Sequence, residues 1–148
     1  MKKIISNMFV CGCMLAAFFC FVACSDDLDV QQVYPFKVET MPVPGRIAKG
    51  ETVEIRCELE KDGDYRNTVY TIRFFQFEGT GTLKTESGIV FHPNDRYLLE
   101  NEKFRLYYTS GCETTQNFIV VVEDNNRQSY EMEFSFNNRK DTADTEKT

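Results

Sequence analysis

The sequence predicts an all-β protein, namely an immunoglobulin-like antiparallel β-sandwich of about seven strands. Apolar and polar residues alternate along several short segments, which is the period of strands with one face on a core. Turn-forming Gly, Pro, Asn and Asp residues separate these segments. No segment shows the period of an amphipathic helix. Because the chain has no Trp, the Cys and Trp signature of true immunoglobulin domains is absent, and a small β-barrel is the alternative.

Residues 51–60 form the clearest predicted strand. Four residues that point the same way are apolar: Val53, Ile55, Cys57 and Leu59. Charged residues occupy the four positions between and after them. This alternation predicts an antiparallel strand with its apolar face on a core.

Residues 68–78 form a second predicted strand, which is rich in aromatic residues. One face carries Tyr70, Ile72 and Phe74, whereas the other carries Phe75 and Phe77. The apolar face therefore switches between Phe74 and Phe75. A β-bulge at that point, or a strand covered on both faces, would explain the switch.

The remaining strands follow from the same pattern. They are expected at 34–40, around 83 and 89–91, at 101–110, at 118–122 and at 130–136. The run 118–122 is continuously apolar and mostly β-branched, so it is expected to be a central strand. Turns are predicted where breakers gather, at 41–45, 61–64, 92–95, 111–115 and 124–127.

The start of the chain has the three-part pattern of a secretory signal peptide. Lys2 and Lys3 form a basic start, and residues 4–23 contain no Asp, Glu, Lys or Arg. The sequence Phe-Val-Ala-Cys that ends at Cys24 resembles a bacterial lipobox. We therefore expect a lipoprotein signal peptide at 1–23 and lipid attachment at Cys24, where two or more acyl chains would give stable membrane anchoring. Secretion without lipid and an uncleaved membrane anchor are the alternatives.

The chain from Cys24 onward divides into three predicted segments. Residues 24–33 are polar and acidic and are expected to be the lipidated Cys with its tether. Residues 34–137 hold the predicted strands and form the sandwich domain. Residues 138–148 have no apolar periodicity and are expected to be a disordered tail.

Composition argues against several classes of function. The formal net charge is −6 and no stretch is strongly basic, so no direct nucleic-acid binding is expected. The other cysteines of the mature chain are Cys57 and Cys112. Export permits a disulfide between them. Two separate free thiols are the favoured interpretation, because one cysteine lies in a predicted strand and the other in a predicted loop.

The residues that could carry chemistry do not form a recognisable constellation. His92 is the single histidine and lies in a predicted turn, whereas nucleophilic catalysis needs a nucleophile and a base within reach. His92, Cys57 and Cys112 lack the short paired spacings of zinc ligands. Asp62 and Asp64 do not match a calcium-binding spacing. We therefore expect a protein that is not an enzyme, with no catalytic residues, no cofactor and no metal.

Four aromatic residues lie outside the main apolar faces of the predicted strands: Phe75, Phe77, Tyr97 and Tyr107. If they are exposed, they are candidates for a partner-binding surface. The alternative is a second layer of core.

Several stretches together resemble the TraQ family of conjugative-transposon transfer lipoproteins of Bacteroides-type bacteria. These stretches are 54–57, 70–81, 93–97, 104–110 and 134–137, and the resemblance spans roughly 34–138. The resemblance implies a role in conjugal DNA transfer as an envelope component, and it carries over no catalytic residue. The Ser-Asp-Asp sequence after Cys24 resembles a surface-export signal of Bacteroides-type lipoproteins, with a solvated spacer as the alternative.

Two functional hypotheses result. The first is a non-enzymatic envelope lipoprotein, an accessory or structural component of a conjugative-transposon transfer apparatus that acts through contacts with other envelope proteins. The second is a surface-exposed immunoglobulin-like lipoprotein that binds a host or glycan ligand. Both place the chain in the cell envelope, held by lipid at the outer membrane, and the tether leaves open which side of that membrane it occupies.

Overall fold

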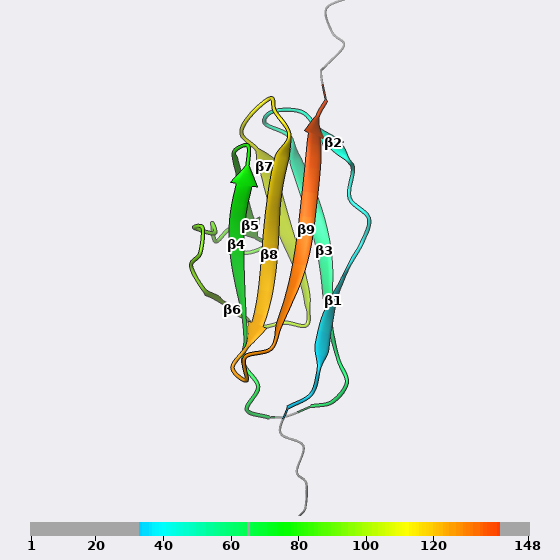
Figure 1. Ribbon diagram of the computed structural model, residues 1–148, viewed down its shortest axis with the longest axis vertical. Helices are drawn as coiled ribbons and strands as arrows, with labels where there is room; N and C mark the ends of the chain where they lie inside the picture. Colours follow the sequence, from blue (N-terminus) through cyan, green and yellow to red (C-terminus); the bar gives the residue numbers. More distant parts are fainter. Residues whose placement is uncertain (1–32, 65, 140–148) are drawn as a thin grey trace, which may run out of the picture. The chain divides into compact units, whose positions relative to one another are not determined.

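The computed structural model describes residues 33–64 and 66–139, which form two β-sheets (Figure 1). The four-stranded sheet has the order β1 (Phe36–Thr40), β3 (Thr52–Lys61), β7 (Lys103–Ser110), β5 (Gly81–Thr85). The five-stranded sheet has the order β2 (Arg46–Ile47), β9 (Ser129–Asn138), β8 (Gln116–Asp124), β4 (Tyr70–Glu78), β6 (Tyr97–Leu99). The described part contains no helix.

The two sheets form a β-sandwich, as the sequence predicts. Among the described strands, none from one sheet pairs with a strand of the other, so the small β-barrel alternative is wrong. The order β1-β3-β7-β5 corresponds to the A-B-E-D sheet of an immunoglobulin domain, and β4-β8-β9 corresponds to C-F-G. Described strand pairs are antiparallel except β2 with β9, which run parallel.

The longer strands match the predicted ones closely. Seven of the nine described strands have five residues or more. The other two, β2 and β6, contain two and three residues and were not predicted. They are too short to show alternation, since one follows the Pro-Gly break and the other follows the turn at 92–95. The predicted central strand is the middle of β8, which lies between β9 and β4.

The switch of apolar faces in β4 has a different cause from a bulge at Phe74 and Phe75. Both residues keep regular register with β8, and the irregularity lies between Gln76 and Glu78. Phe74 is buried and Phe75 is half-buried, so β4 carries aromatic residues on both of its faces. The predicted position of the bulge is therefore wrong, and the outer face of β4 is only partly covered, with Phe75 half-buried and Phe77 71% exposed.

Stacked aromatic rings fill the space between the sheets. Phe118 stacks on Tyr108 with ring centroids 4.2 Å apart and on Phe134 at 5.2 Å. Phe74 meets Phe118 edge-on at 5.5 Å. Such aromatic pairs add to the gain from apolar burial. This cluster occupies the core in a chain that has no Trp.

A chain of hydrogen bonds closes one end of the core. The Tyr108 hydroxyl donates to Gln116 Oε1 at 2.7 Å, and Gln116 Nε2 donates to Ser110 Oγ at 2.8 Å. Gln76 Nε2 donates to the Tyr108 hydroxyl at 2.8 Å. The buried polar groups of Tyr108, Ser110 and Gln116 therefore all have hydrogen-bond partners. Gly81 is required beside them, because a Cβ there would collide with the Tyr108 ring and hydroxyl.

The two cysteines of the described part are free thiols, in agreement with the favoured interpretation of the sequence. Cys57 is buried on β3, and burial raises the pKa of its thiol to about 12. A thiolate at Cys57 is therefore disfavoured at neutral pH. Cys112 lies in the β7–β8 loop.

The sandwich continues one residue into the predicted tail. Asn138 is the last residue of β9 and pairs with Ile47 of β2. The backbone N–H of Arg139 then donates to the Ile47 carbonyl at 2.9 Å. The signal peptide, Cys24 and nearly all of the tether lie outside the described residues, as do residues 140–148. Within 33–64 and 66–139, no helix is long and apolar enough to cross a membrane.

Candidate functional site

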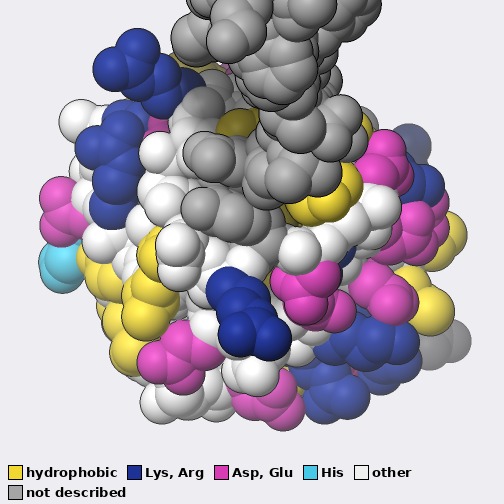
Figure 2. All heavy atoms as spheres, turned by 90° about the horizontal axis from the view of Figure 1, so that it is seen from below, with side chains coloured by type: hydrophobic (Ala, Val, Ile, Leu, Met, Phe, Trp, Pro, Cys, Tyr) yellow, Lys and Arg dark blue, Asp and Glu magenta, His cyan; other side chains and the backbone are white. Residues whose placement is uncertain are grey.

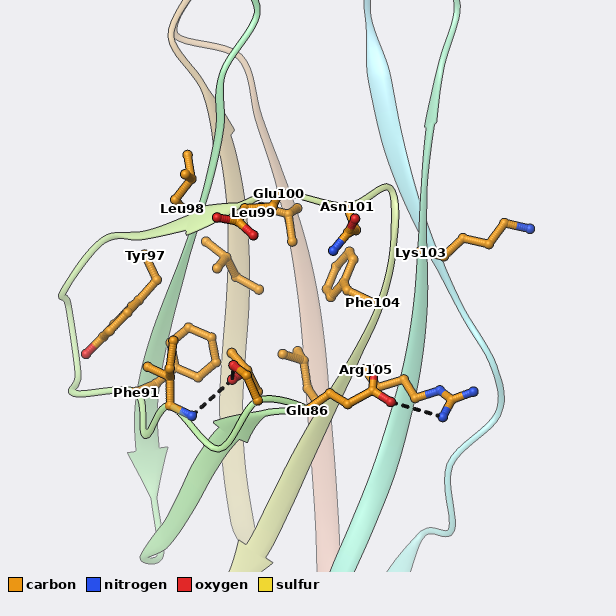
Figure 3. Close-up of a pocket in the computed structure, with 15 residues that line it drawn as sticks. Glu86, Phe91, Tyr97, Leu98, Leu99, Glu100, Asn101, Lys103, Phe104 and Arg105 are labelled. Atoms are coloured by element: carbon orange, nitrogen blue, oxygen red, sulfur yellow. Dashed lines mark hydrogen bonds and ion pairs between the residues drawn. The ribbon is translucent and has the colours of Figure 1, made fainter.

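An open hollow lies where the short strand β6 and the segment that leads to it approach β7 (Figure 3). Its volume is about 510 Å³, within the range of small-ligand pockets. Figure 3 shows Leu99, Phe104 and Phe91 around its interior, with β6 crossing above them. The hollow therefore gives an opening from solvent toward the core between the two sheets.

The wall of the hollow is held in place by Tyr97. Its ring meets the buried Phe91 edge-on at 4.6 Å, and its hydroxyl accepts a hydrogen bond from the backbone N–H of His92 at 2.9 Å. Opposite Tyr97 in the ladder is the buried Ile72 of β4. Tyr97 therefore fixes the loop before β6 against the end of the core.

The rim of the hollow combines charge with exposed apolar side chains. Arg105 Nη1 and Glu86 Oε1 form an ion pair at 3.4 Å across it. The apolar Ile89 on this rim is 52% exposed. Leu98 of β6 is 61% exposed, and Figure 3 shows its side chain pointing away from the interior of the hollow. Figure 2 shows hydrophobic side chains gathered beside the histidine at the margin of this view. The hollow is suited to apolar side chains of another molecule that also carries polar groups, because its interior is apolar and its rim is partly charged.

The described residues offer little for catalysis or metal binding. No group of three or more His, Cys, Asp or Glu side chains in 33–64 and 66–139 could hold a metal ion. His92 is exposed in its turn. The pKa of the Cys112 thiol is lowered to about 7 by hydrogen bonds from the Thr114 hydroxyl and the Thr80 backbone N–H. This thiol lies in the loop that joins β7 to β8, at the end of the strands away from the start of β1 (Figure 1).

The four aromatic residues singled out from the sequence are not brought together. Phe75 and Phe77 point outward from β4 on the five-stranded sheet, and Phe77 is 71% exposed. Tyr107 points outward from β7 on the four-stranded sheet. Tyr97 packs inward against the core. They therefore belong to two outer faces and one interior wall, not to a single surface.

The outer face of the five-stranded sheet carries an ion-pair cluster around one carboxylate. Glu123 on β8 accepts from Arg73 Nη1 at 2.8 Å and from Arg96 Nε at 2.9 Å. Partial burial would raise the pKa of Glu123, but the hydrogen bonds from the two arginines outweigh it, and the pKa is lowered. The Arg73 guanidinium also lies over the Phe75 ring, 4.8 Å from its centroid. Arg73 thereby ties β4 to β8 and covers part of Phe75.

The outer face of the four-stranded sheet is organised differently. Its strands β1, β3 and β7 present alternating acids and bases, which form cross-strand and same-strand ion pairs. These pairs are Lys37 with Glu39 and Glu60, Arg56 with Glu54, Arg105 with Glu54 and Lys103 with Glu58. Most of these side chains are well exposed, so each pair contributes little to stability.

Sequence reasoning missed both the hollow and the Glu123 cluster. Ile89 on the rim and its neighbour Val90 were predicted as part of a strand, whereas Val90 forms only an isolated bridge with Lys84. Arg73 and Glu123 lie in two strands whose adjacency only the sheet order reveals. The outward Arg73 within an aromatic run was the one available signal, because a charge between aromatic neighbours needs a partner.

The described strands define a small immunoglobulin-like β-sandwich. A family model described as TraQ conjugal transfer protein matches residues 7–139. The chain therefore belongs to this family, as the resemblance in its sequence indicates. None of the curated proteins matches this chain.

Three solved structures are closely similar. The crystal structure of a conjugative transposon lipoprotein from Bacteroides eggerthii is 68% identical, with a TM-score of 0.68, and covers 72% of this chain and 100% of its own. The solution structure of a lipoprotein from Bacteroides thetaiotaomicron is 46% identical, with a TM-score of 0.67 and coverage of 84% and 98%. That of a conjugate transposon protein from Bacteroides vulgatus is 50% identical, with a TM-score of 0.64 and coverage of 76% and 91%.

Proposed function

We propose that this protein is a lipid-anchored envelope component of a conjugative-transposon DNA transfer apparatus and acts through contacts with other proteins. The observation that carries the proposal is the family match, which extends over 7–139 and so includes the lipobox as well as the sandwich. The similar proteins from two Bacteroides species are described as conjugative transposon proteins, one of them as a lipoprotein.

The surface supports contact rather than catalysis as the mode of action. A hollow with an apolar interior and the exposed Ile89 on its rim opens at the edge of the sandwich. The outer face of the five-stranded sheet carries the exposed Phe77 and an ion-pair cluster around Glu123. Features of this kind fit recognition of another protein surface, whereas the histidine, the one strong candidate for a base, stands exposed in a turn.

The anchoring step is proposed to occur at Cys24, with the domain held at the outer membrane. Metabolic labelling with a radioactive fatty acid should mark the wild-type chain and not Cys24→Ser. Fractionation should move that variant from the membrane to the soluble fraction with its fold intact. Continued labelling of Cys24→Ser would refute the assigned site, and protease treatment of intact cells would show which side of the membrane the domain occupies.

The role in transfer is tested by deletion and a mating assay in the host of the transposon. Deletion should lower the frequency of transfer, and the wild-type gene supplied in trans should restore it. Ile89→Asp places a charge on the rim of the hollow, so it should restore transfer less well than the wild-type gene, while Ile89→Ala serves as a milder control. An unchanged mating frequency on deletion would overturn the proposal, and surface exposure together with that result would favour binding of a host or glycan ligand.

A further inference from the structure

The outward face of β9, β8 and β4 combines three features in adjacent columns (Figure 1). The middle of the face is apolar, because Ile119 and Val121 of β8 and Phe75 of β4 point outward and are half-buried. Phe77 extends this band at the end of β4 and is 71% exposed. Apolar side chains on the outside of a two-layer sandwich have no layer of their own fold to cover them.

One border of this apolar band is acidic. Glu131 and Glu133 point outward from β9, directly opposite Val121 and Ile119 in the ladder. Both are exposed. Within 33–64 and 66–139 neither carboxylate has an ion pair or hydrogen bond, whereas the carboxylates Glu54, Glu58 and Glu60 on the other sheet are each paired with a base.

The opposite border of the band is basic. Arg73 and Arg96 share the single carboxylate of Glu123, so this cluster keeps one excess positive charge. Arg96 uses its Nε for that contact and its side chain is 62% exposed. Its remaining guanidinium nitrogens face solvent and can pair with a carboxylate of another molecule.

The face formed by these three columns of side chains is complementary to the same face of a second copy. The ladder aligns Arg73, Val121 and Glu131 in one row, and Phe75, Ile119 and Glu133 in the next. A two-fold axis parallel to β8 exchanges the two borders when one face is laid on its copy. Val121 and Ile119 then meet the same residues of the second copy, and the acidic border lies over the basic one.

We propose that this face, comprising Phe75, Phe77, Ile119, Val121, Glu131 and Glu133 with the Arg73–Arg96 cluster, binds the same face of a second copy. The interface is isologous, as in most homodimers. Its apolar centre and charged borders follow the usual anatomy of a protein interface. The charge pattern favours the orientation in which the acidic border of one copy lies over the basic border of the other. The alternative orientation would place like charges opposite each other.

The direct test uses the full-length, lipid-anchored chain in the membrane of a Bacteroides host. A residue near a two-fold axis meets its own copy, so Val121→Cys should be cross-linked into a dimer by a short bis-maleimide. A maleimide bridge is needed because packed sheets lie about 10 Å apart, beyond the reach of a disulfide. Cys112→Ser in the background removes the other accessible thiol.

The matched control is Arg56→Cys, which presents a thiol on the outer face of the four-stranded sheet. We expect a cross-linked dimer from Val121→Cys and about tenfold less from Arg56→Cys, which corresponds to about 1.4 kcal/mol of preference. Equal yields from the two positions would reflect random collision and would overturn the proposal. Absence of any dimer from Val121→Cys at normal abundance would do the same.

Charge reversal supplies a second, independent readout. Glu131→Arg with Glu133→Arg opposes two bases to the Arg73–Arg96 cluster, so the yield of dimer should fall about tenfold. These two side chains are exposed, so the fold is not at risk. Adding Arg96→Glu should restore the yield, because acid again faces base. An unchanged yield after both sets of substitutions would contradict the proposed role of the charges. Cross-linking of Val121→Cys to a different protein would show that this protein, and not a second copy, binds the face.

Discussion

The two outer faces of the sandwich differ in how their charged and apolar side chains are arranged. On the four-stranded sheet, β1, β3 and β7 present acids and bases in alternation, and the charges pair within the face. On the five-stranded sheet, Glu123 pairs with Arg73 and Arg96. Beyond this cluster, Glu131 and Glu133 lie at one border without a partner among the described residues, and Ile119 and Val121 occupy the centre. The first arrangement leaves nothing for another molecule to complete. The second leaves these two acids without partners in the described chain beside exposed apolar side chains, and this difference is why we propose it as the interaction surface.

The largest expected effect separates the inner from the outer positions of β8. Phe118 is fully buried among aromatic rings, so Phe118→Ala should lower the free energy of unfolding by about 3–5 kcal/mol. Ile119 is its outward neighbour, and Ile119→Ala should cost about 1 kcal/mol in the monomer, because only part of the side chain is removed from water. Chemical denaturation measures both. Equal losses would show that the outer face is as tightly covered as the core.

A smaller effect is expected at Glu123, the shared carboxylate of the five-stranded face. Glu123→Gln should lower the free energy of unfolding by about 1–2 kcal/mol, because both arginines lose a charged acceptor. The pKa of Glu123 is lowered in the folded protein. Its contribution is therefore complete above about pH 4.5 and is lost as pH falls through the folded pKa. Unfolding curves of the wild type and the variant should converge in acid, and parallel curves would contradict this account.

A still smaller effect is expected at Glu54, the corresponding shared carboxylate of the four-stranded face. Its pKa is lowered chiefly by the hydrogen bond from Arg56, but the group is in contact with solvent. Glu54→Gln should therefore change stability less than Glu123→Gln, and the difference from wild type should vanish in high salt. Thermal unfolding at low and high salt measures this. A loss as large as that at Glu123 would erase the contrast between the two faces.

The smallest effect on stability is expected at the cysteines, where the contrast is one of reactivity. The thiol of Cys112 has a pKa of about 7, so its alkylation by iodoacetamide should accelerate between roughly pH 6 and 8 as the thiolate forms. Cys57 has a pKa raised to about 12 by burial and should react only on unfolding. Mass spectrometry of alkylated peptides distinguishes the two sites. Equal labelling of both in the native protein would show that β3 opens readily.

The long strands of this fold can be predicted from the sequence, because each has one face that must be buried and is therefore apolar. The alternation at Val53, Ile55 and Cys57 is sufficient to place β3 and its inward face. Two-residue and three-residue strands leave no such pattern, so β2 and β6 appear only when their partners are known. The bulge of β4 also depends on a distant contact, since Gln76 turns toward the hydroxyl of Tyr108 on another sheet.

The candidate sites are less visible in sequence for the same reason. Phe75 and Phe77 were recognised as unusual because they break the alternation of β4, and they do lie on an outer face. Tyr107 and Tyr97 were grouped with them by residue type, but their strands belong to other parts of the sandwich. The hollow near Leu98 depends on how a loop without periodicity folds back on β7, which no local pattern encodes.

The direction in which the described chain enters and leaves the sandwich bears on assembly at a membrane. β1 begins at one end of the strands and β9 finishes at the other (Figure 1). A two-fold axis that runs along the strands keeps both entry points at the same end. Two copies whose lipids share one leaflet could therefore meet side by side without either domain turning over. Confinement to that plane would raise their effective concentration, so a face too weak to associate in free solution could still do so there.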